Sequence, residues 1–465
     1  RIRYPTMITT RNFSCSKFSI KIIGAVALML LTSCAHNPKT KTALGWKKIG
    51  SYPYLGANSV HRYEYPNGLK LLVLEDHSAP VFTYHTWFNV GSKDEQPGLT
   101  GLAHLFEHMM FKATKNYPDG HFDRTLERAG SEMTNAFTSR DYTAYVQSMP
   151  NEHLELLVKL ESDRIVNLIV DDQALNKERE VVQNERRFRN ENNPDGKLYE
   201  SIFTLAFKKH SYRWPVIGYA EDLERAKSAE CYEFYKRFYA PNNATIVVVG
   251  DVVPDDVAEV ILKHYGHLTP TEIKRHKSPV EPPQIAERTQ TLRQKIQVEK
   301  LVVGYHIPPV THPDTAALGV LRSVLATGKS SRLHRKLVDA GIASEISVDD
   351  GESRDPGLMV FFVTLQKGRS AKRALKIIDQ EIKAIQKSGV TQIEIDRAVA
   401  QNRFSLIDFQ ASLHYRAMFL GYYESIAGDF KKGVELVNSY KTIRSKDVSR
   451  MAMQYLQPTQ RSVVY

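Results

Sequence analysis

Two histidines and a glutamate lie within five positions of the segment GLTGLAHLFEHMMFKAT, residues 98–114. His104, Glu107 and His108 are spaced i, i+3 and i+4, which places them on one face of a helix. Imidazoles one turn apart can both bind one metal ion, and zinc accepts nitrogen ligands. A carboxylate between them can take the proton of a metal-bound water and return it to a leaving amine. The pattern H-x-x-E-H therefore predicts a hydrolase site with one zinc ion per chain.

The same segment carries the apolar pattern of a core-facing helix. Its large apolar residues recur at i, i+3, i+4, i+7 and i+8, and these are Leu102, Leu105, Phe106, Met109 and Met110. Thr100, which stands just ahead of this stripe, is the predicted N-cap. The histidines then occupy a face beside the buried stripe.

A catalytic zinc ion usually has three protein ligands, so a third ligand is needed. The segment NKEREVVQNERRFRNENNPDG, residues 176–196, predicts a second helix that ends at its Asn/Pro/Asp/Gly cluster. Glu178 and Glu185 fall on one face of that helix. Either could be the third ligand, and the spacing alone does not choose between them.

These motifs resemble those of the pitrilysin metallopeptidases, family M16, which includes insulinase and the beta subunit of mitochondrial processing peptidase. In that family, H-x-x-E-H is followed further along the chain by two glutamates seven positions apart. The resemblance implies that His104, His108 and Glu185 bind zinc and that Glu107 is the general base. It also implies that Glu178 is a second carboxylate that acts on the ligand network.

The segment SEMTNAFTSRDYTAYV, residues 131–146, is similar to the N-A-x-T…T-x-Y stretch of the same family. The resemblance implies that Asn135 and Ala136 lie on an edge strand that pairs with the backbone of an extended peptide. Without the resemblance, Asn135 is equally well explained as an ordinary turn residue.

The chain beyond residue 50 shows signs of duplication. Two strand-like runs in 68–92 precede the histidine helix, and a strand-like run that begins with KLVV at Lys300 precedes another apolar-periodic helix. That second helix has Leu318, Leu321, Val324 and Leu325 but no H-x-x-E-H. The segments FYAPNNATIVVV and YLQPTQRSVVY share an aromatic residue, a proline and a β-branched run at one offset. Two related halves would explain this.

We therefore predict an α+β fold of two homologous half-domains, with antiparallel-rich sheets and flanking helices, of the clamshell type that the resemblance implies. The predicted order is a signal peptide, a tether, a zinc-binding half, a Pro-rich linker and a catalytically silent half that is truncated at its end or has a shortened last unit. The corresponding ranges are 1–33, 34–49, 50–267, 268–292 and 293–465.

The N-terminal segment predicts export. Lys17 and Lys21 precede an apolar run that is too short for a comfortable membrane span and ends in Leu-Thr-Ser-Cys. This resembles a bacterial lipoprotein signal, which implies lipidation at Cys34 and a periplasmic position, with the outer membrane favoured over the inner one. A plain secretory signal is the alternative. Initiation is expected at Met7.

Composition excludes several other classes of protein. With 42% hydrophobic and 25% charged residues, the chain is neither disordered nor polytopic. Three cysteines give no disulfide framework and no thiolate zinc site. The net charge of +11 falls to +6 without the five basic residues of 1–33, and the basic residues are scattered, which gives nucleic-acid binding little support. Gly328-Lys329-Ser330 lacks the upstream glycine of a phosphate-binding loop, so nucleotide binding is rejected.

One departure from the family pattern concerns the second half. Active relatives commonly use an Arg and a Tyr there to hold the substrate, but the matching positions are Val338 and Ser344, with Arg335 nearby. We hypothesise that a homologous partner chain, or a second copy, supplies the missing pair. The alternative function is a non-catalytic scaffold or peptide-binding subunit, and a zinc-storage lipoprotein is disfavoured because the 16 histidines are mostly scattered.

Overall fold

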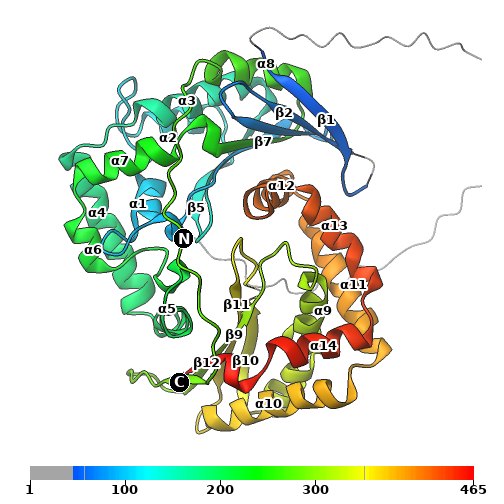
Figure 1. The fold of residues 1–465 in the computed structure, drawn as a ribbon. Coiled ribbons are helices and arrows are strands. Elements are labelled where there is room, and N and C mark those ends of the chain that lie inside the picture. The colour runs from blue at the N-terminus through cyan, green and yellow to red at the C-terminus, as the bar shows by residue number, and fades with distance from the viewer. Residues whose placement is uncertain (1–44, 57, 350) are drawn as a thin grey trace, which may run out of the picture. The chain divides into compact units, whose positions relative to one another are not determined.

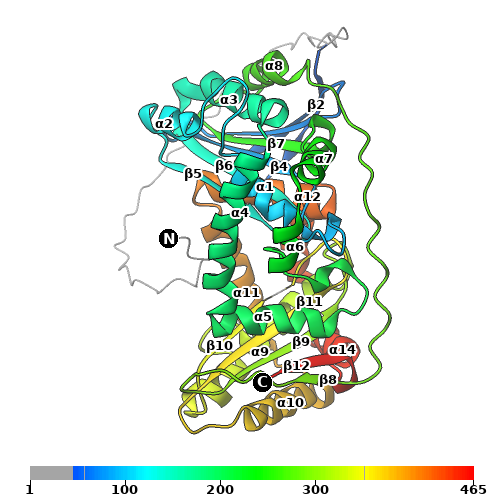
Figure 2. The ribbon, with the colours of Figure 1, turned by 90° about the vertical axis from the view of Figure 1, so that its left-hand side faces the viewer.

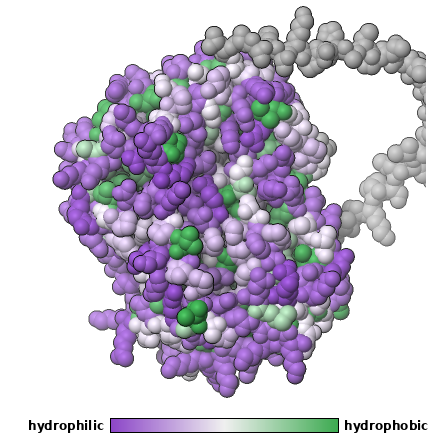
Figure 3. Space-filling model, in the orientation of Figure 1, coloured by the Kyte–Doolittle hydropathy of each residue, from purple (hydrophilic) through white to green (hydrophobic). Residues whose placement is uncertain are grey.

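The computed structural model describes residues 45–56, 58–349 and 351–465. The predicted signal peptide, Cys34 and most of the predicted tether lie outside these residues. Within the described ranges, no helix has both the length and the apolar character needed to cross a bilayer. The face shown in Figure 3 is mainly hydrophilic, with apolar side chains scattered over it.

The first half is built on a seven-stranded sheet with the strand order β1-β2-β3-β7-β4-β6-β5 (Figure 1). In sequence order the strands are β1 (Lys47–Pro53), β2 (Ser59–Glu64), β3 (Lys70–Glu75), β4 (Val81–Phe88), β5 (Met133–Thr138), β6 (Thr143–Pro150) and β7 (Ala244–Gly250). The pair β3–β7 is parallel, and the other neighbouring pairs are antiparallel. Strand β5 is an edge strand whose partner in this sheet is β6.

The second half is built on a five-stranded sheet with the order β10-β11-β9-β12-β8. Its strands are β8 (Arg288–Gln290), β9 (Lys300–Ile307), β10 (Ala343–Asp349), β11 (Gly357–Leu365) and β12 (Arg461–Val464). The pair β12–β8 is parallel and the other pairs are antiparallel. The segment predicted to be a linker thus contains one short strand, β8.

The two sheets repeat one topology. Read from β8, the second sheet runs β8-β12-β9-β11-β10, which matches β3-β7-β4-β6-β5 strand for strand, including the position of the parallel pair. The segments whose similarity suggested duplication contribute β7 and β12, which occupy equivalent places. The predicted α+β fold with two related halves and antiparallel-rich sheets is therefore confirmed.

Helices flank both sheets. Those of the first half are α1 (Leu102–Met109), α2 (His121–Arg128), α3 (Leu154–Asn167), α4 (Asp172–Arg186), α5 (Pro194–Ala206), α6 (Ala220–Arg225), α7 (Ser228–Phe238) and α8 (Pro254–Tyr265). Those of the second half are α9 (Thr315–Ala326), α10 (Ala371–Ser388), α11 (Gln392–Phe409), α12 (Leu413–Ala427), α13 (Lys431–Ser439) and α14 (Ser445–Tyr455).

Each half covers one face of its sheet with its own helices and the other face with a helix from the other half. On β7, Ile246 and Val248 join the core formed with the first-half helices, whereas Val247 and Val249 pack with α12. In the second sheet, Val302 of β9 and Val464 of β12 pack against α5 (Figure 2). Because successive side chains of a strand point to opposite faces, two covered faces explain why β7 contains the unbroken apolar run Ile246–Val249.

The close approach of α12 to the first sheet depends on a glycine. A Cβ at Gly421 would lie 2.0 Å from Nε1 of Trp87, which is fully buried on β4. No larger residue fits at position 421 without a shift of the helix or the indole ring. A glycine at position 421 therefore allows α12 of the second half to pack closely on the sheet of the first half.

Candidate metal centre

Helix α1 carries the H-x-x-E-H motif, and its N-terminus differs from the prediction. The N-cap is Gly101, with a left-handed φ of +92°, and not Thr100. The Thr100 hydroxyl instead donates to Asp222, at 2.7 Å from Oδ2. The buried Glu95 carboxylate accepts hydrogen bonds from the free N–H groups at the start of the helix, those of Gly101 and Ala103, both at 2.8 Å. The N-cap prediction was wrong because a carboxylate from an upstream loop takes the role that local sequence assigned to Thr100.

Helix α4 brings the distant carboxylates to α1. The side chains of His104, His108 and Glu185 each offer one ligand atom, and these atoms lie within 4.8 Å of one another. Glu185 Oε2 is 3.2 Å from His108 Nε2 and 3.8 Å from His104 Nε2. The structure thus brings together the three residues that were predicted to bind zinc.

The second glutamate of α4 lies on the other side of the same histidine. Glu178 Oε2 is 3.7 Å from His108 Nδ1, and Glu178 Oε1 is 2.9 Å from the ammonium of Lys112. Glu185 faces both Nε2 atoms, whereas Glu178 faces a single Nδ1. This asymmetry, which spacing could not predict, favours Glu185 as the third ligand.

Electrostatics prepare part of this donor set for a cation. Burial, and then the neighbouring His108, lower the pKa of His104 to about 3, so its imidazole is neutral, which is the form that binds metals. Burial alone would raise the pKa of Glu185, but the hydrogen bond from His108 and nearby positive charges outweigh it and hold the pKa at about 2. Two imidazoles that can bind in their neutral form, together with one carboxylate, are a donor set that fits zinc.

His108 shows the opposite balance. Burial would lower its pKa, but its contacts with Glu178 and Glu185 raise the pKa to about 9. A cation that binds at Nε2 must displace the proton that these carboxylates favour. The carboxylates of Glu178 and Glu185 stabilise this proton by their negative charge. A divalent ion bound at the same place would neutralise that charge instead.

Glu107 lies beside the donor set without being part of it. The Thr138 hydroxyl of β5 donates to Glu107 Oε2 at 2.6 Å. Burial raises the pKa of Glu107, only partly offset by this hydrogen bond and by His108. A carboxylate with a raised pKa and one oxygen not engaged by Thr138 is suited to accept and return a proton.

The predicted substrate residues lie on the adjoining strand. Asn135 and Ala136 belong to the edge strand β5, so Asn135 is a strand residue and not a turn residue. The Asn135 side chain accepts a hydrogen bond from the Ala136 N–H at 2.9 Å. Because β5 pairs with β6 on one side, its other edge can accept a further strand. The residues' role in binding stays a prediction.

Three residues at this site were not predicted: Thr138, Lys112 and Arg189. Arg189 Nη1 lies 2.7 Å from Glu185 Oε1, which leaves Oε2 directed to the histidines. Lys112 and Arg189 each follow a predicted ligand by four positions, a helical spacing that could have identified them. Thr138 depends on how β5 packs on α1, for which the sequence offers no local signal.

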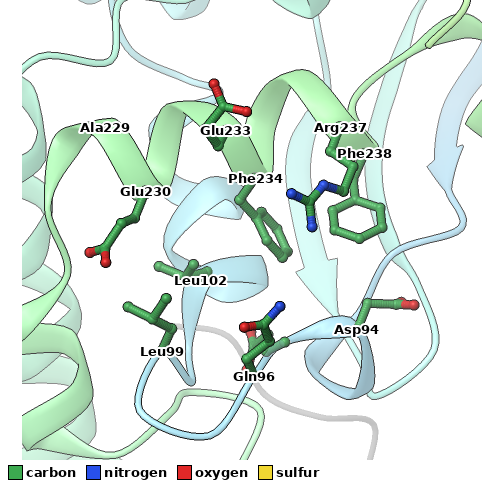
Figure 4. Close-up of a pocket in the computed structure, with 11 residues that line it drawn as sticks. Asp94, Gln96, Leu99, Leu102, Ala229, Glu230, Glu233, Phe234, Arg237 and Phe238 are labelled. Atoms are coloured by element: carbon green, nitrogen blue, oxygen red, sulfur yellow. The ribbon is translucent and has the colours of Figure 1, made fainter. Parts of the chain in front are cut away.

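A separate pocket of about 320 Å³ lies on another side of α1, between α7 and the loop before α1 (Figure 4). Phe234 of α7 points toward the loop residues Leu99 and Gln96, and Leu102 of α1 contributes to the floor. None of the predicted ligands or Glu107 lines this pocket. The cavity is therefore distinct from the donor set.

Val338 and Ser344 are the two positions at which the sequence resemblance leads us to expect an Arg and a Tyr. Val338 lies in the π-helical segment His334–Asp339. Ser344 is the second residue of the edge strand β10, and its hydroxyl donates to the Thr364 carbonyl oxygen at 3.2 Å. Neither side chain can supply a cation or a phenol.

Comparison with known proteins places this geometry in a family. Residues 70–218 match the family model described as insulinase, peptidase family M16, and residues 226–402 match the peptidase M16 inactive domain. The chain is 29% identical over 405 residues to the zinc protease PqqE of Helicobacter pylori, which covers 86% of this chain and 90% of that protein. It is 24% identical over 399 residues to YmxG of Bacillus subtilis, described as an uncharacterized zinc protease, covering 85% and 95% of the two chains.

The fold is also found in solved structures. The crystal structure of a protease from Helicobacter pylori superimposes with a TM-score of 0.83 and 29% identity, and the match covers 88% of this chain and 99% of the other. The two family matches take in both halves and together more than half of the chain. With its duplicated fold and with H-x-x-E-H on α1, the chain belongs to peptidase family M16.

Proposed function

We propose that this chain is a zinc-dependent endopeptidase that cleaves extended peptides or unfolded segments. The observation that carries the proposal is the convergence of His104, His108 and Glu185 from two helices onto one point, with Glu107 beside them. Named relatives that are zinc proteases support it.

The residues would divide the work as follows. His104, His108 and Glu185 would hold the ion. Zinc, when bound, supplies Lewis-acid chemistry that makes water more acidic and a peptide carbonyl more electrophilic. Glu107 would accept the proton of the attacking water and return it to the leaving amine. Thr138 would keep one oxygen of Glu107 fixed so that the other is available for this transfer.

The substrate class follows from the edge of the first sheet. A peptide that adds to β5 must be extended, because main-chain pairing requires a strand conformation. Asn135 and Ala136 lie on this strand together with Thr138, so the same element that positions Glu107 would also bind substrate. Folded proteins would be poor substrates because their backbone groups are already paired.

Two further parts of the proposal concern context. The absence of Arg and Tyr at Val338 and Ser344 supports a partner chain, or a second copy, that completes the site. The leader-like residues 1–33 support export and a lipid anchor at Cys34, on the periplasmic side of a bacterial membrane.

The purified chain provides the test of zinc-dependent peptidase activity. Metal analysis should give one zinc per chain, and a quenched fluorescent peptide should be hydrolysed. Chelation should abolish hydrolysis, and stoichiometric zinc should restore it. If zinc binds with the expected stoichiometry but no peptide is cleaved, even when a homologous chain carrying the Arg/Tyr pair is added, the scaffold alternative is correct.

A further inference from the structure

Lys112 lies just beyond the C-terminal end of α1, whose last residue is Met109. Lys112 follows His108 by four positions and His104 by eight, and its backbone N–H donates to the Met109 carbonyl oxygen at 2.9 Å just after the helix ends. From this turn the Lys112 side chain reaches Glu178 of α4, with Nζ 2.9 Å from Oε1.

Glu178 is shared between Lys112 and His108. Its side chain is only 7% exposed, with Oε1 at 2.9 Å from Lys112 Nζ and Oε2 at 3.7 Å from His108 Nδ1. A buried carboxylate is costly unless it is paired. The ammonium supplies that pairing and fixes one oxygen, so that the other oxygen is directed to the imidazole.

The two histidines differ in what orients them. His108 Nε2 faces Glu185 at 3.2 Å, so Nδ1 is the nitrogen left for a second partner, and Glu178 is placed to accept its proton. The corresponding Nδ1 of His104 is buried and has no hydrogen-bond partner in the described part of the chain. A carboxylate behind a ligating imidazole fixes its tautomer and ring orientation. Of the two imidazoles, His108 is therefore the one whose orientation a carboxylate can set.

We propose that Lys112 is a positioning residue of the metal centre, which acts through Glu178 to fix the ring of His108 for zinc binding. The inference rests on the proposed function, because it presumes that zinc binds at this centre. It assigns to Lys112 no contact with substrate. Loss of the Lys112 ammonium should lower the affinity for zinc, and this loss should depend on the presence of the Glu178 carboxylate.

The test measures the zinc dissociation constant by competition with a fluorescent chelator at one pH, for folded wild-type and variant proteins. Lys112→Met should weaken zinc binding by about 10- to 100-fold, the usual cost of losing a partner of a metal ligand, because Glu178 would no longer hold the His108 ring. Lys112→Arg should recover most of the affinity, because it restores a cation beside Glu178. Lys115→Met is the matched control: Lys115 is exposed three positions away and should leave the affinity unchanged.

A double-mutant cycle separates this role from general stabilisation. In a Glu178→Gln background, Lys112→Met should weaken zinc binding by less than about threefold, because the carboxylate through which it acts is gone. An equal loss in both backgrounds, or wild-type affinity in Lys112→Met, would overturn the positioning role while leaving the proposed function intact. Absence of zinc binding by the wild-type chain would overturn both.

Discussion

Glu107 lies between the predicted zinc ligands and accepts a hydrogen bond from Thr138, and the sequence could show only the first of these two properties. The spacing of H-x-x-E-H places it between the ligands, and the structure adds the Thr138 hydroxyl that holds Oε2 at 2.6 Å. Spacing also left Glu178 and Glu185 equivalent, since both lie on one face of α4. Packing of α4 on α1 separates them, because Glu185 meets both Nε2 atoms and Glu178 meets one Nδ1. Sequence predicts which side chains share a helix face, but contacts between helices require the fold.

The substitution Glu107→Gln tests the base directly. It should keep one zinc per chain, because Glu107 is not among the three clustered ligands. Its kcat should fall by about 10²- to 10⁴-fold, the usual contribution of a positioned general base. Glu180→Gln, at an exposed position on α4, should match the wild type in zinc content and rate. Near-wild-type turnover by Glu107→Gln would show that another group moves the proton.

At the scale of elements, the helices and strands were largely readable from apolar periodicity, but their partners were not. The patterns predicted α1, α4, α9 and the central strands. They did not indicate that α12 crosses the first sheet and α5 the second, because an amphipathic helix does not encode which sheet it covers. At the α12 contact, His85 of β4 and His414 of α12 are joined by a hydrogen bond of 3.0 Å between Nε2 and Nδ1.

This histidine pair predicts acid sensitivity of the fold. Burial lowers the pKa of His414 to about 4, and burial followed by the charge of His414 lowers the pKa of His85 well below its usual value. As the pH falls below about 6.5, the unfolded chain takes up protons that the folded chain excludes, so the free energy of unfolding decreases towards pH 4. The variant His414→Gln should therefore lose less stability between pH 7 and pH 5 in urea titrations. If the free energy of unfolding of His414→Gln fell between pH 7 and pH 5 as steeply as that of the wild type, the histidine pair would not be the cause of the acid sensitivity.

At the scale of the whole molecule, the two sheets repeat one arrangement of strands. The repeated order of strands gives each half an equivalent edge, β5 in the first and β10 in the second. The first copy keeps H-x-x-E-H on α1, the helix that follows β4. The second has an apolar helix and lacks Arg and Tyr at Val338 and Ser344. The similarity of short segments could reveal the repeat, whereas the reciprocal exchange of α5 and α12 depends on contacts far apart in sequence.

Assembly should therefore control turnover. We expect the isolated chain to bind zinc but to cleave peptides slowly, and a homologous chain that carries the Arg/Tyr pair to raise kcat by about 100-fold, as expected for groups that stabilise developing charge. Light scattering with size-exclusion chromatography should show that the active species contains more than one chain. Full turnover by a monomer would contradict the partner hypothesis.

The central claim is that two distant segments of the chain hold one divalent ion. Anomalous diffraction at the zinc absorption edge, on crystals of zinc-loaded protein, tests it most directly. The account predicts one strong peak, about 2.0–2.2 Å from His104 Nε2, His108 Nε2 and a Glu185 oxygen, which is absent in crystals of His108→Ala. A peak elsewhere, or zinc-loaded crystals with no peak between these three side chains, would contradict it.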